Sequence, residues 1–583
     1  MKLPSGHPKL GSEKTSQVPN AKKPKPRAPR GCYTGPYPVG TMEIEVPASD
    51  PRVFSHISRN KRHLLQLETV LMTVYYPATS PDPHDKNAAK QGALAVPVFF
   101  PTVFTKLPAF RNAPVARYWA PEVNTKTRGK RVKTEVGEKP DGAEEEPVFP
   151  FILFSHVCGE FASHGFVVCA VEHRDGSGPR TIINCAKRGE GIATDIERRG
   201  QVDHRDEERS QGFGIIDYIF PKDNPIDTSP QNDKGVDTEL RKAQIDLRMA
   251  ELQEAYGVMT EIVGGNGKMI ADRNLRKKGY KGSSRHGLDG IDWSRWKDRV
   301  RLDHVTICGH SFGAATAVEI LRHNDRFNYV SQGIIYDIWG AGTRPVEDDK
   351  HRISAPLIAI NSEAFTYWPS NFKLVESIVK ETQDEPEPCP AWLMTLRGTV
   401  HVSQSDFSLL YPNVCSIFLK MVANPRRALD LNINASLEFL SHVLPKELAQ
   451  VSRAYKNEEF LETELSHLER IPSEAMHRPK KEKYLAARLQ IRHEWIYRIS
   501  PKLFRSLKRW KMKRQGHPPQ PNDEIWLHSK PREHVVDHFL RSVSGRDPDH
   551  KEDFDLDGPA TQEGTDEVKP VQIKDSDGEG TLG

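Results

Sequence analysis

The sequence predicts an α/β fold, in which helices cover both faces of a mainly parallel β-sheet. Three observations predict this class. Segments with strand and helix composition alternate between residues 149 and 396, the strand segments are almost continuously apolar, and a G-x-S-x-G motif lies between one strand segment and a helix segment. Continuously apolar strands are typical of parallel sheets that are buried on both faces. We therefore expect a single large sheet that carries a turn with an exposed serine.

The predicted elements follow one another in a regular order. Apolar and β-branched composition predicts strands at 71–76, 149–154, 166–171, 305–308, 333–336, 357–360 and 392–396. Helical spacing or composition predicts helices at 158–164, 239–262 and 314–322. Pro77 ends the first of these strands, because proline has no N–H to donate to a neighbouring strand. Beyond about residue 450 no strand is expected.

Charge divides the chain of 583 residues, whose net charge is only +4, into four parts. Residues 1–31 are rich in lysine and proline and are expected to be a disordered basic segment. The catalytic domain is expected at 32–450, with polar insertions at about 123–148 and 263–300. Residues 451–542 are expected to form a basic helical extension, and residues 543–583 a disordered acidic tail.

Several classes of protein do not match this chain. It has no apolar run long enough to cross a bilayer, and its first residues lack the apolar core of a secretory signal. The seven cysteines are scattered without a C-x-x-C pair, so we expect reduced thiols and a cytoplasmic location, with membrane association left open. No phosphate-binding or dinucleotide-binding loop occurs. We expect no metal, no organic cofactor and no nucleic-acid partner.

The strongest chemical signal is the run from Gly309 to Gly313, which contains Ser311. A strand before it and a helix after it are typical of the nucleophile elbow of the α/β-hydrolase fold. A serine nucleophile needs a histidine base and a carboxylate that orients the base, in the chain order Ser, Asp, His. Asp337 directly follows the strand at 333–336, and His401 follows the strand at 392–396 after a short loop. The sequence therefore predicts an α/β-hydrolase with this triad, although position alone leaves open that His401 is an ordinary loop histidine.

Six sequence pieces together resemble the platelet-activating factor acetylhydrolase family, in particular its fungal intracellular members. They are FSH at 154–156, SHGFVV at 163–168, VEHRDGS at 171–177, the elbow, GIIYD at 333–337 and RGTVH at 397–401. The resemblance covers roughly residues 35–445. It implies calcium-independent hydrolysis of short or oxidised sn-2 acyl groups of phospholipids, and it implies that Ser311, Asp337 and His401 are the triad.

The chain departs from that family directly after His156. In the family a Gly-Leu-Gly-Gly-like loop follows, and one of its N–H groups joins that of the residue after the serine to form the oxyanion hole. Here Val157 and Cys158 follow at once. Phe312 supplies one backbone donor, and the second has to come from Val157 or a neighbour. Because one missing donor typically costs ~10²–10³ in turnover, we expect impaired activity.

Two other functions remain open on the sequence: a general carboxylesterase or lipase that uses the same triad, and a non-catalytic protein that binds lipid surfaces. The basic amphipathic segment between Ser500 and Gly516 either docks on the catalytic domain or contacts a membrane. The charged run His173–Arg174–Asp175 is expected to be either structural or part of the pocket rim.

Overall fold

The computed structural model describes residues 34–78, 148–154, 158–445, 459–466 and 524–542, together with Leu448, Trp510 and Arg514. Short breaks occur at 179, 190, 222–223, 225–226, 228–233, 278, 284–286, 347–349, 384–387 and 406. The predicted segment 1–31, almost all of the insertion 123–148 and the tail 543–583 lie outside the described residues.

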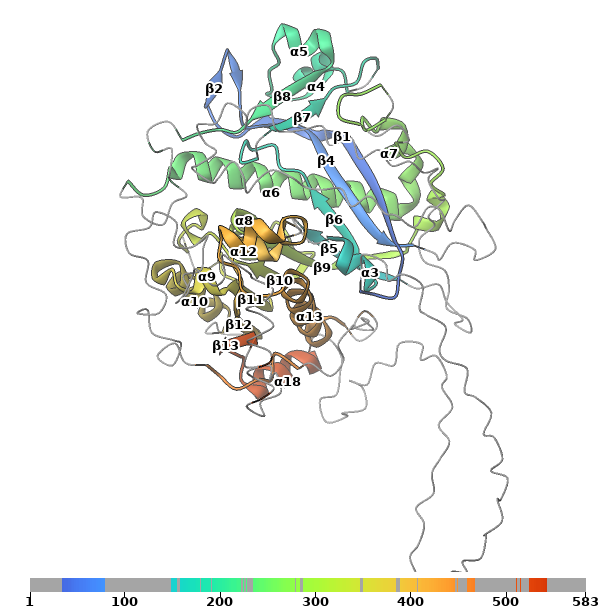
Figure 1. The fold of residues 1–583 in the computed structure, drawn as a ribbon. Helices are drawn as coiled ribbons and strands as arrows, with labels where there is room; N and C mark the ends of the chain where they lie inside the picture. The colour runs from blue at the N-terminus through green and yellow to red at the C-terminus, as the bar shows by residue number, and fades with distance from the viewer. Residues whose placement is uncertain are drawn as a thin grey trace, which may run out of the picture.

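The centre of the molecule is one nine-stranded sheet, with the order β1-β4-β6-β5-β9-β10-β11-β12-β13 (Figure 1). Its strands are β1 (Val39–Val53), β4 (Gln66–Pro77), β5 (Phe149–Phe154), β6 (Val167–Val171), β9 (Val300–His310), β10 (Val330–Tyr336), β11 (Leu357–Ser362), β12 (Ala391–Leu396) and β13 (Ile525–Ser529). The strands from β6 to β12 run parallel, and β1, β4 and β13 pair antiparallel at the two edges. The predicted α/β fold with a mainly parallel sheet is confirmed.

Helices cover both faces of this sheet, which explains the apolar strands. In β5 the side chains of Phe151 and Leu153 join one core cluster, and Ile152 between them joins the other. The first cluster includes side chains from α6 (Thr238–Glu261), α8 (Phe312–Arg322) and α10 (Pro369–Gln383). The second includes side chains from α3 (Cys158–Ser163) and α13 (Pro425–Val443), and α18 (Glu533–Ser542) packs against α13.

A smaller lobe lies beside β1 and β4, at the top of Figure 1. It contains two small two-stranded antiparallel sheets and two short helices: β2 (Ser58–Arg59) with β3 (Arg62–His63), β7 (Arg180–Asn184) with β8 (Phe213–Asp217), α4 (Ala193–Arg199) and α5 (Asp206–Gln211). The short pieces α9 (Glu363–Thr366), η4 (Gly340–Gly342), η5 (His401–Gln404), α11 (Phe407–Leu410) and α12 (Pro412–Ile417) follow the carboxyl ends of β10 to β12.

The expectation that strands end near residue 450 is wrong. β13 pairs antiparallel with β12, with Leu396 opposite Ile525 and Met394 opposite Leu527. The side chains of Ile525 and Leu527 are buried in the second core cluster. The extension 451–542 is therefore not purely helical, and it supplies the last strand of the sheet.

The segment 263–300, expected as a polar insertion, is folded against the edge of the sheet. It contains most of the π-turn η2 (Ile262–Asn266), α7 (Gly267–Arg273), η3 (Trp293–Trp296) and the first residue of β9. Trp296 is buried, and its ring meets that of Tyr76 edge-on with 5.0 Å between centroids. Within the described residues, no helix has both the length and the apolar composition that a membrane crossing requires.

Candidate active site

Ser311 lies in the sharp turn between β9 and α8, as the motif predicts. Its backbone has φ 58° and ψ −119°, a left-handed conformation that is strained for a residue with a side chain. A Cβ on Gly309 would lie 2.3 Å from the carbonyl oxygen of Gly313, so the turn requires a glycine at position 309. The carbonyl of Ser311 accepts hydrogen bonds from the N–H groups of Ala314 and Trp339, each at 3.1 Å.

Asp337 and His401 are neighbours in the structure. The two atoms His401 Nδ1 and Asp337 Oδ2 are 3.1 Å apart. Asp337 is fully buried and also has a positive φ, of 40°. Because a carboxylate only accepts hydrogen bonds, Nδ1 of His401 is the protonated nitrogen in this contact, and Nε2 of a neutral ring is then the acceptor.

Ser362, at the end of β11, completes the surroundings of the Asp337 carboxylate. Its backbone N–H donates to Oδ1, and its hydroxyl donates to Oδ2. Together with His401, three donors hold the carboxylate in one orientation. The sequence reasoning missed Ser362, although a polar residue at the end of a predicted strand beside the triad strand was an available signal.

The main chain also brings Ser311 and His401 together. His310, which precedes the serine, donates its Nε2–H to the backbone carbonyl of His401 at 3.1 Å. The backbone N–H of Ser311 donates to the backbone carbonyl of Tyr336, the residue before Asp337, at 3.0 Å. The three predicted residues thus lie in one region at the carboxyl ends of β9, β10 and β12, whereas they are far apart in the sequence.

Of the two predicted oxyanion residues, the structure describes only Phe312. Phe312 is the first residue of α8, and the first N–H groups of a helix have no partner within it. Val157 lies outside the described residues, so its predicted role stays a prediction. The connection between β5 and α3 is short, since β5 ends at Phe154 and α3 begins at Cys158 and has only six residues.

A buried ionic network supports Phe312 from α6 (Thr238–Glu261). The guanidinium of Arg248 lies 4.2 Å from the centroid of the Phe312 ring. The same guanidinium donates to Asp175 Oδ2 and to Ser177 Oγ, each at 2.6 Å. Burial by itself would raise the pKa of Asp175, but Arg248, His173 and the hydrogen bonds from Ser177 lower it to about 2.

The neighbouring residues of the run 173–175 are also paired. His173 lies 2.7 Å from Glu251, and Arg174 lies 2.6 Å from Glu45, a residue of β1. Arg174, Glu45 and Glu251 are all buried. The charged run therefore has a structural role, because it joins β6, β1 and α6 through buried ion pairs. The alternative of a place near the pocket rim stays a prediction.

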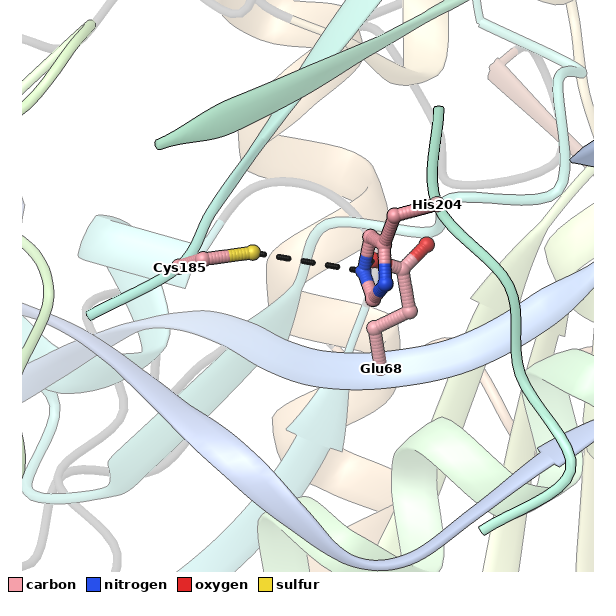
Figure 2. Close-up of side chains that lie close together, drawn as sticks. All are labelled: Glu68, Cys185 and His204. Atoms are coloured by element: carbon pink, nitrogen blue, oxygen red, sulfur yellow. Dashed lines mark hydrogen bonds and ion pairs between the residues drawn. The ribbon is translucent and has the colours of Figure 1, made fainter. Parts of the chain in front are cut away.

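One cluster outside this region has the residue types of a metal site. Figure 2 shows Glu68, Cys185 and His204 with their side chains directed toward one another. His204 Nε2 is 2.6 Å from Glu68 Oε2, and its Nδ1 is 2.8 Å from Glu197. A tetrahedral zinc ion about 2.0 Å from each ligand atom holds two such atoms roughly 3.3 Å apart, so a nitrogen and an oxygen at 2.6 Å are spaced as a hydrogen bond and not as two zinc ligands.

Charges explain the cluster better than a metal does. Arg62 forms an ion pair with Glu68 as well. Burial tends to lower the pKa of His204, but its contacts with Cys185 and Glu68 raise it to about 11. His204 is therefore a buried imidazolium between carboxylates, which holds the small lobe to β4.

A strained serine between a central strand and a helix, with an aspartate and a histidine after later strands of a mainly parallel sheet, defines the α/β-hydrolase class. Residues 22–459 match the profile of the family described as platelet-activating factor acetylhydrolase, isoform II. Because this match spans most of the chain, the chain belongs to that family.

The individual relatives share less than a third of their aligned residues with this chain. The chain is 28% identical over 308 residues to the platelet-activating factor acetylhydrolase of Gallus gallus, which covers 50% of this chain and 61% of that protein. It is 29% identical over 307 residues to the protein of the same name from Bos taurus, with 50% and 56% covered. A Schizosaccharomyces pombe protein named "putative phospholipase A2" is 24% identical over 455 residues, with 70% and 91% covered. The chain thus matches somewhat more than half the length of the vertebrate relatives.

Proposed function

We propose that this protein hydrolyses acyl esters of phospholipids and releases short sn-2 acyl groups through a serine acyl-enzyme. The main support is the Asp337–His401 pair beside a serine held in a strained turn. Such strain persists only where the surrounding structure enforces it, and it is concentrated at active sites. Membership of the acetylhydrolase family and the names of the relatives support the phospholipid substrate.

The proposed reaction has two steps. Ser311 Oγ attacks the acyl carbonyl carbon while His401 Nε2 takes its proton, and the bond to the lysophospholipid oxygen breaks as that oxygen receives the proton. Water then attacks the acyl-enzyme with His401 again as the base, which releases the carboxylic acid and restores Ser311. Asp337 holds the imidazole and stabilises its positive charge. The step requires no metal and no organic cofactor.

The oxyanion of both steps is assigned to the N–H of Phe312 and to a second donor at or next to Val157. A fluorophosphonate probe tests the nucleophile: it should label the protein, and Ser311→Ala should abolish labelling. Ser377→Ala, at an exposed serine of α10, is the matched control and should label normally. Labelling that survives Ser311→Ala would refute the assignment.

Turnover tests the second oxyanion donor. If that donor is missing, p-nitrophenyl acetate turnover should lie ~10²–10³ below ordinary esterases, and a glycine-containing loop inserted after His156 should raise it. A wild-type kcat within the common range of ~1–10³ s⁻¹ would instead mean that both donors are in place.

A general carboxylesterase or lipase is the alternative enzyme. Acetyl phospholipid, long-chain phospholipid and an aryl acetate separate the candidates. An acetylhydrolase should prefer the acetyl phospholipid to the long-chain phospholipid at equal concentration. Equal kcat/KM for all three substrates would favour the general esterase.

The proposed location is the cytoplasm, which is supported by the free thiols of the six cysteines among the described residues.

Contact with a phospholipid surface is also part of the proposal. Of the segment from Ser500 to Gly516 only Trp510 and Arg514 are described, and Trp510 is exposed. A second apolar surface lies on α11, α12 and the next residue, and α11 packs against η5, which begins at His401. Its exposed side chains are Leu409, Leu410, Ile417 and Phe418, the last with 66% of its surface accessible.

Liposome co-sedimentation distinguishes these two surfaces. Deletion of 470–583 would also remove β13, so single substitutions are the better test. Phe418→Ser should weaken binding if α12 contacts the lipid, whereas Arg509→Glu should weaken it if the basic segment does. Met269→Ser, at an exposed methionine of α7, is the control. Lipid binding without any fluorophosphonate labelling would favour the non-catalytic alternative.

A further inference from the structure

The imidazole of His401 lies between two other rings. The ring of Phe365, from α9, is stacked on it with 4.4 Å between centroids and an angle of 6° between planes. The ring of His310, from the end of β9, is stacked with 4.4 Å between centroids and an angle of 28°. Both stacking partners are buried, and the side chain of His401 is 20% exposed.

Each outer ring is itself held in place. Phe365 meets Trp368 edge-on at 5.7 Å, and Ser362 caps the start of its helix. His310 donates its Nε2–H to the backbone carbonyl of the same His401 on which it is stacked. The stack is therefore fixed to the backbone of β9 and α9, and rotation of the His401 ring about its side-chain bonds would collide with one face or the other.

The groups around His401 have different roles, because the group that orients the ring lies at its edge and the other groups cover its faces. Asp337 binds the ring edge at Nδ1. His310, the other titratable group at the ring, covers one face. Glu363 on α9 instead accepts hydrogen bonds from the N–H of Gly398, in the loop before His401, and from the hydroxyl of Tyr367, which follows α9. The face opposite His310 is thus covered by an uncharged aromatic ring.

We propose that Phe365 and His310 are positioning residues for His401, and that the face of Phe365 stabilises the imidazolium formed when His401 takes the serine proton. The face of an aromatic ring carries negative quadrupole density, and a cation within about 6 Å of its centroid is attracted to it. The catalytic part of this inference rests on the proposed function. The stack itself is a property of the fold and can be measured without catalysis.

Phe365→Leu tests the role of the ring, because leucine keeps an apolar side chain and removes the aromatic face. The protonated form of His401 then loses stabilisation, so the titration midpoint of His401 should move to lower pH by ~0.4–1.5 units. Nuclear magnetic resonance of the full-length protein with labelled histidine Cε1 measures this midpoint, and His401→Gln assigns the signal. Phe365→Tyr should keep the wild-type midpoint.

The kinetic readout is the pH profile of aryl acetate hydrolysis. Phe365→Leu should shift the acid limb to lower pH and reduce kcat by about 2- to 30-fold, with little change in KM. His310→Ala should also lower kcat, and His310→Phe, which restores a ring on that face, should recover part of it. Phe439→Leu, at a buried phenylalanine of α13 that packs on Trp392, is the control and should leave the profile unchanged.

The outcomes separate the two proposals. An unchanged His401 midpoint in folded Phe365→Leu overturns the charge-stabilising role of the stack. A shifted midpoint in a protein that never reacts with a fluorophosphonate supports the stack and contradicts the hydrolase. If Phe365→Leu does not fold, the same NMR experiment on Phe365→Trp decides: a larger ring face should raise the midpoint or leave it unchanged, and a lower midpoint overturns the inference.

Discussion

Replacing Arg248 by methionine should destabilise the protein and impair the elbow together. Methionine keeps most of the length and the apolar stem of the side chain, but it removes the guanidinium. That group makes two hydrogen bonds of 2.6 Å, to Asp175 and Ser177, and covers the ring of Phe312. Asp175 is fully buried, so the substitution leaves a carboxylate without its cation away from water.

The expected loss follows from this burial. Removing one partner of a buried ion pair typically costs ~3–5 kcal/mol of unfolding free energy, because the remaining charge is uncompensated. The pKa of Asp175 gives a second measure. Its depression from 3.8 to about 2 corresponds to about 2 kcal/mol at neutral pH. Since the folded-state pKa is the lower one, this stability is present above pH ~4 and is lost as the pH falls toward 2.

Urea unfolding followed by tryptophan fluorescence at pH 7 and at pH 3 measures both effects. Arg248→Met should lose several kcal/mol at pH 7 and should lose part of the wild-type dependence on acid. Arg180→Met, which breaks the exposed pair with Asp217, is the matched control and should cost at most ~1 kcal/mol. If Arg248→Met costs no more than Arg180→Met, the network beneath Phe312 does not stabilise the fold and the reasoning is refuted.

Three further results are expected. Gly309→Ala should reduce turnover by ~10² or more, because a methyl group at 2.3 Å from the Gly313 carbonyl must displace the turn, whereas Gly257→Ala, in open space on α6, should leave turnover unchanged. His204→Gln should destabilise the protein at pH 7, and because the pKa of His204 is raised to about 11, the difference from wild type should shrink as the pH rises from about 7 toward 11; a constant difference would contradict the imidazolium assignment. Dialysis against a metal chelator should leave the thermal midpoint unchanged, and a fall that added zinc reverses in wild type but not in His204→Gln would show that the Glu68, Cys185 and His204 cluster holds a metal.

Much of the central fold could be predicted because its strands and the serine turn produce short-range patterns in the sequence. The parallel strands are buried on both faces, so their apolar runs are visible in the sequence, and the elbow has a recognisable glycine spacing. The positions of Asp337 and His401 followed from one rule, that catalytic residues of such sheets lie just beyond the carboxyl ends of strands. Strand β4 begins five residues earlier than expected, at Gln66, because buried polar residues (Gln66, Glu68 and Thr69) interrupt the apolar pattern at its start.

What escaped prediction depends on pairing across long distances in the chain. Nothing local indicates that Arg174 pairs with Glu45, which is 129 residues away. The same holds for Ser362, whose two hydrogen bonds to Asp337 exist only once β10 and β11 lie side by side. β13 has only three consecutive apolar residues, and its identity as a strand comes from the free edge of β12 that it covers.

The late position of β13 has a consequence for synthesis of the chain. β12 ends at Leu396 and β13 begins at Ile525, so 128 residues separate the two paired strands. At ~5–20 residues per second, a ribosome needs roughly 6–26 s to make that stretch. During this interval the strand that precedes His401 presents an unpaired edge to other nascent chains, and such edges invite intermolecular pairing. Chaperone binding at the β12 edge is therefore most valuable in this interval, after the strands that carry Ser311 and Asp337 have been made and before the sheet is closed.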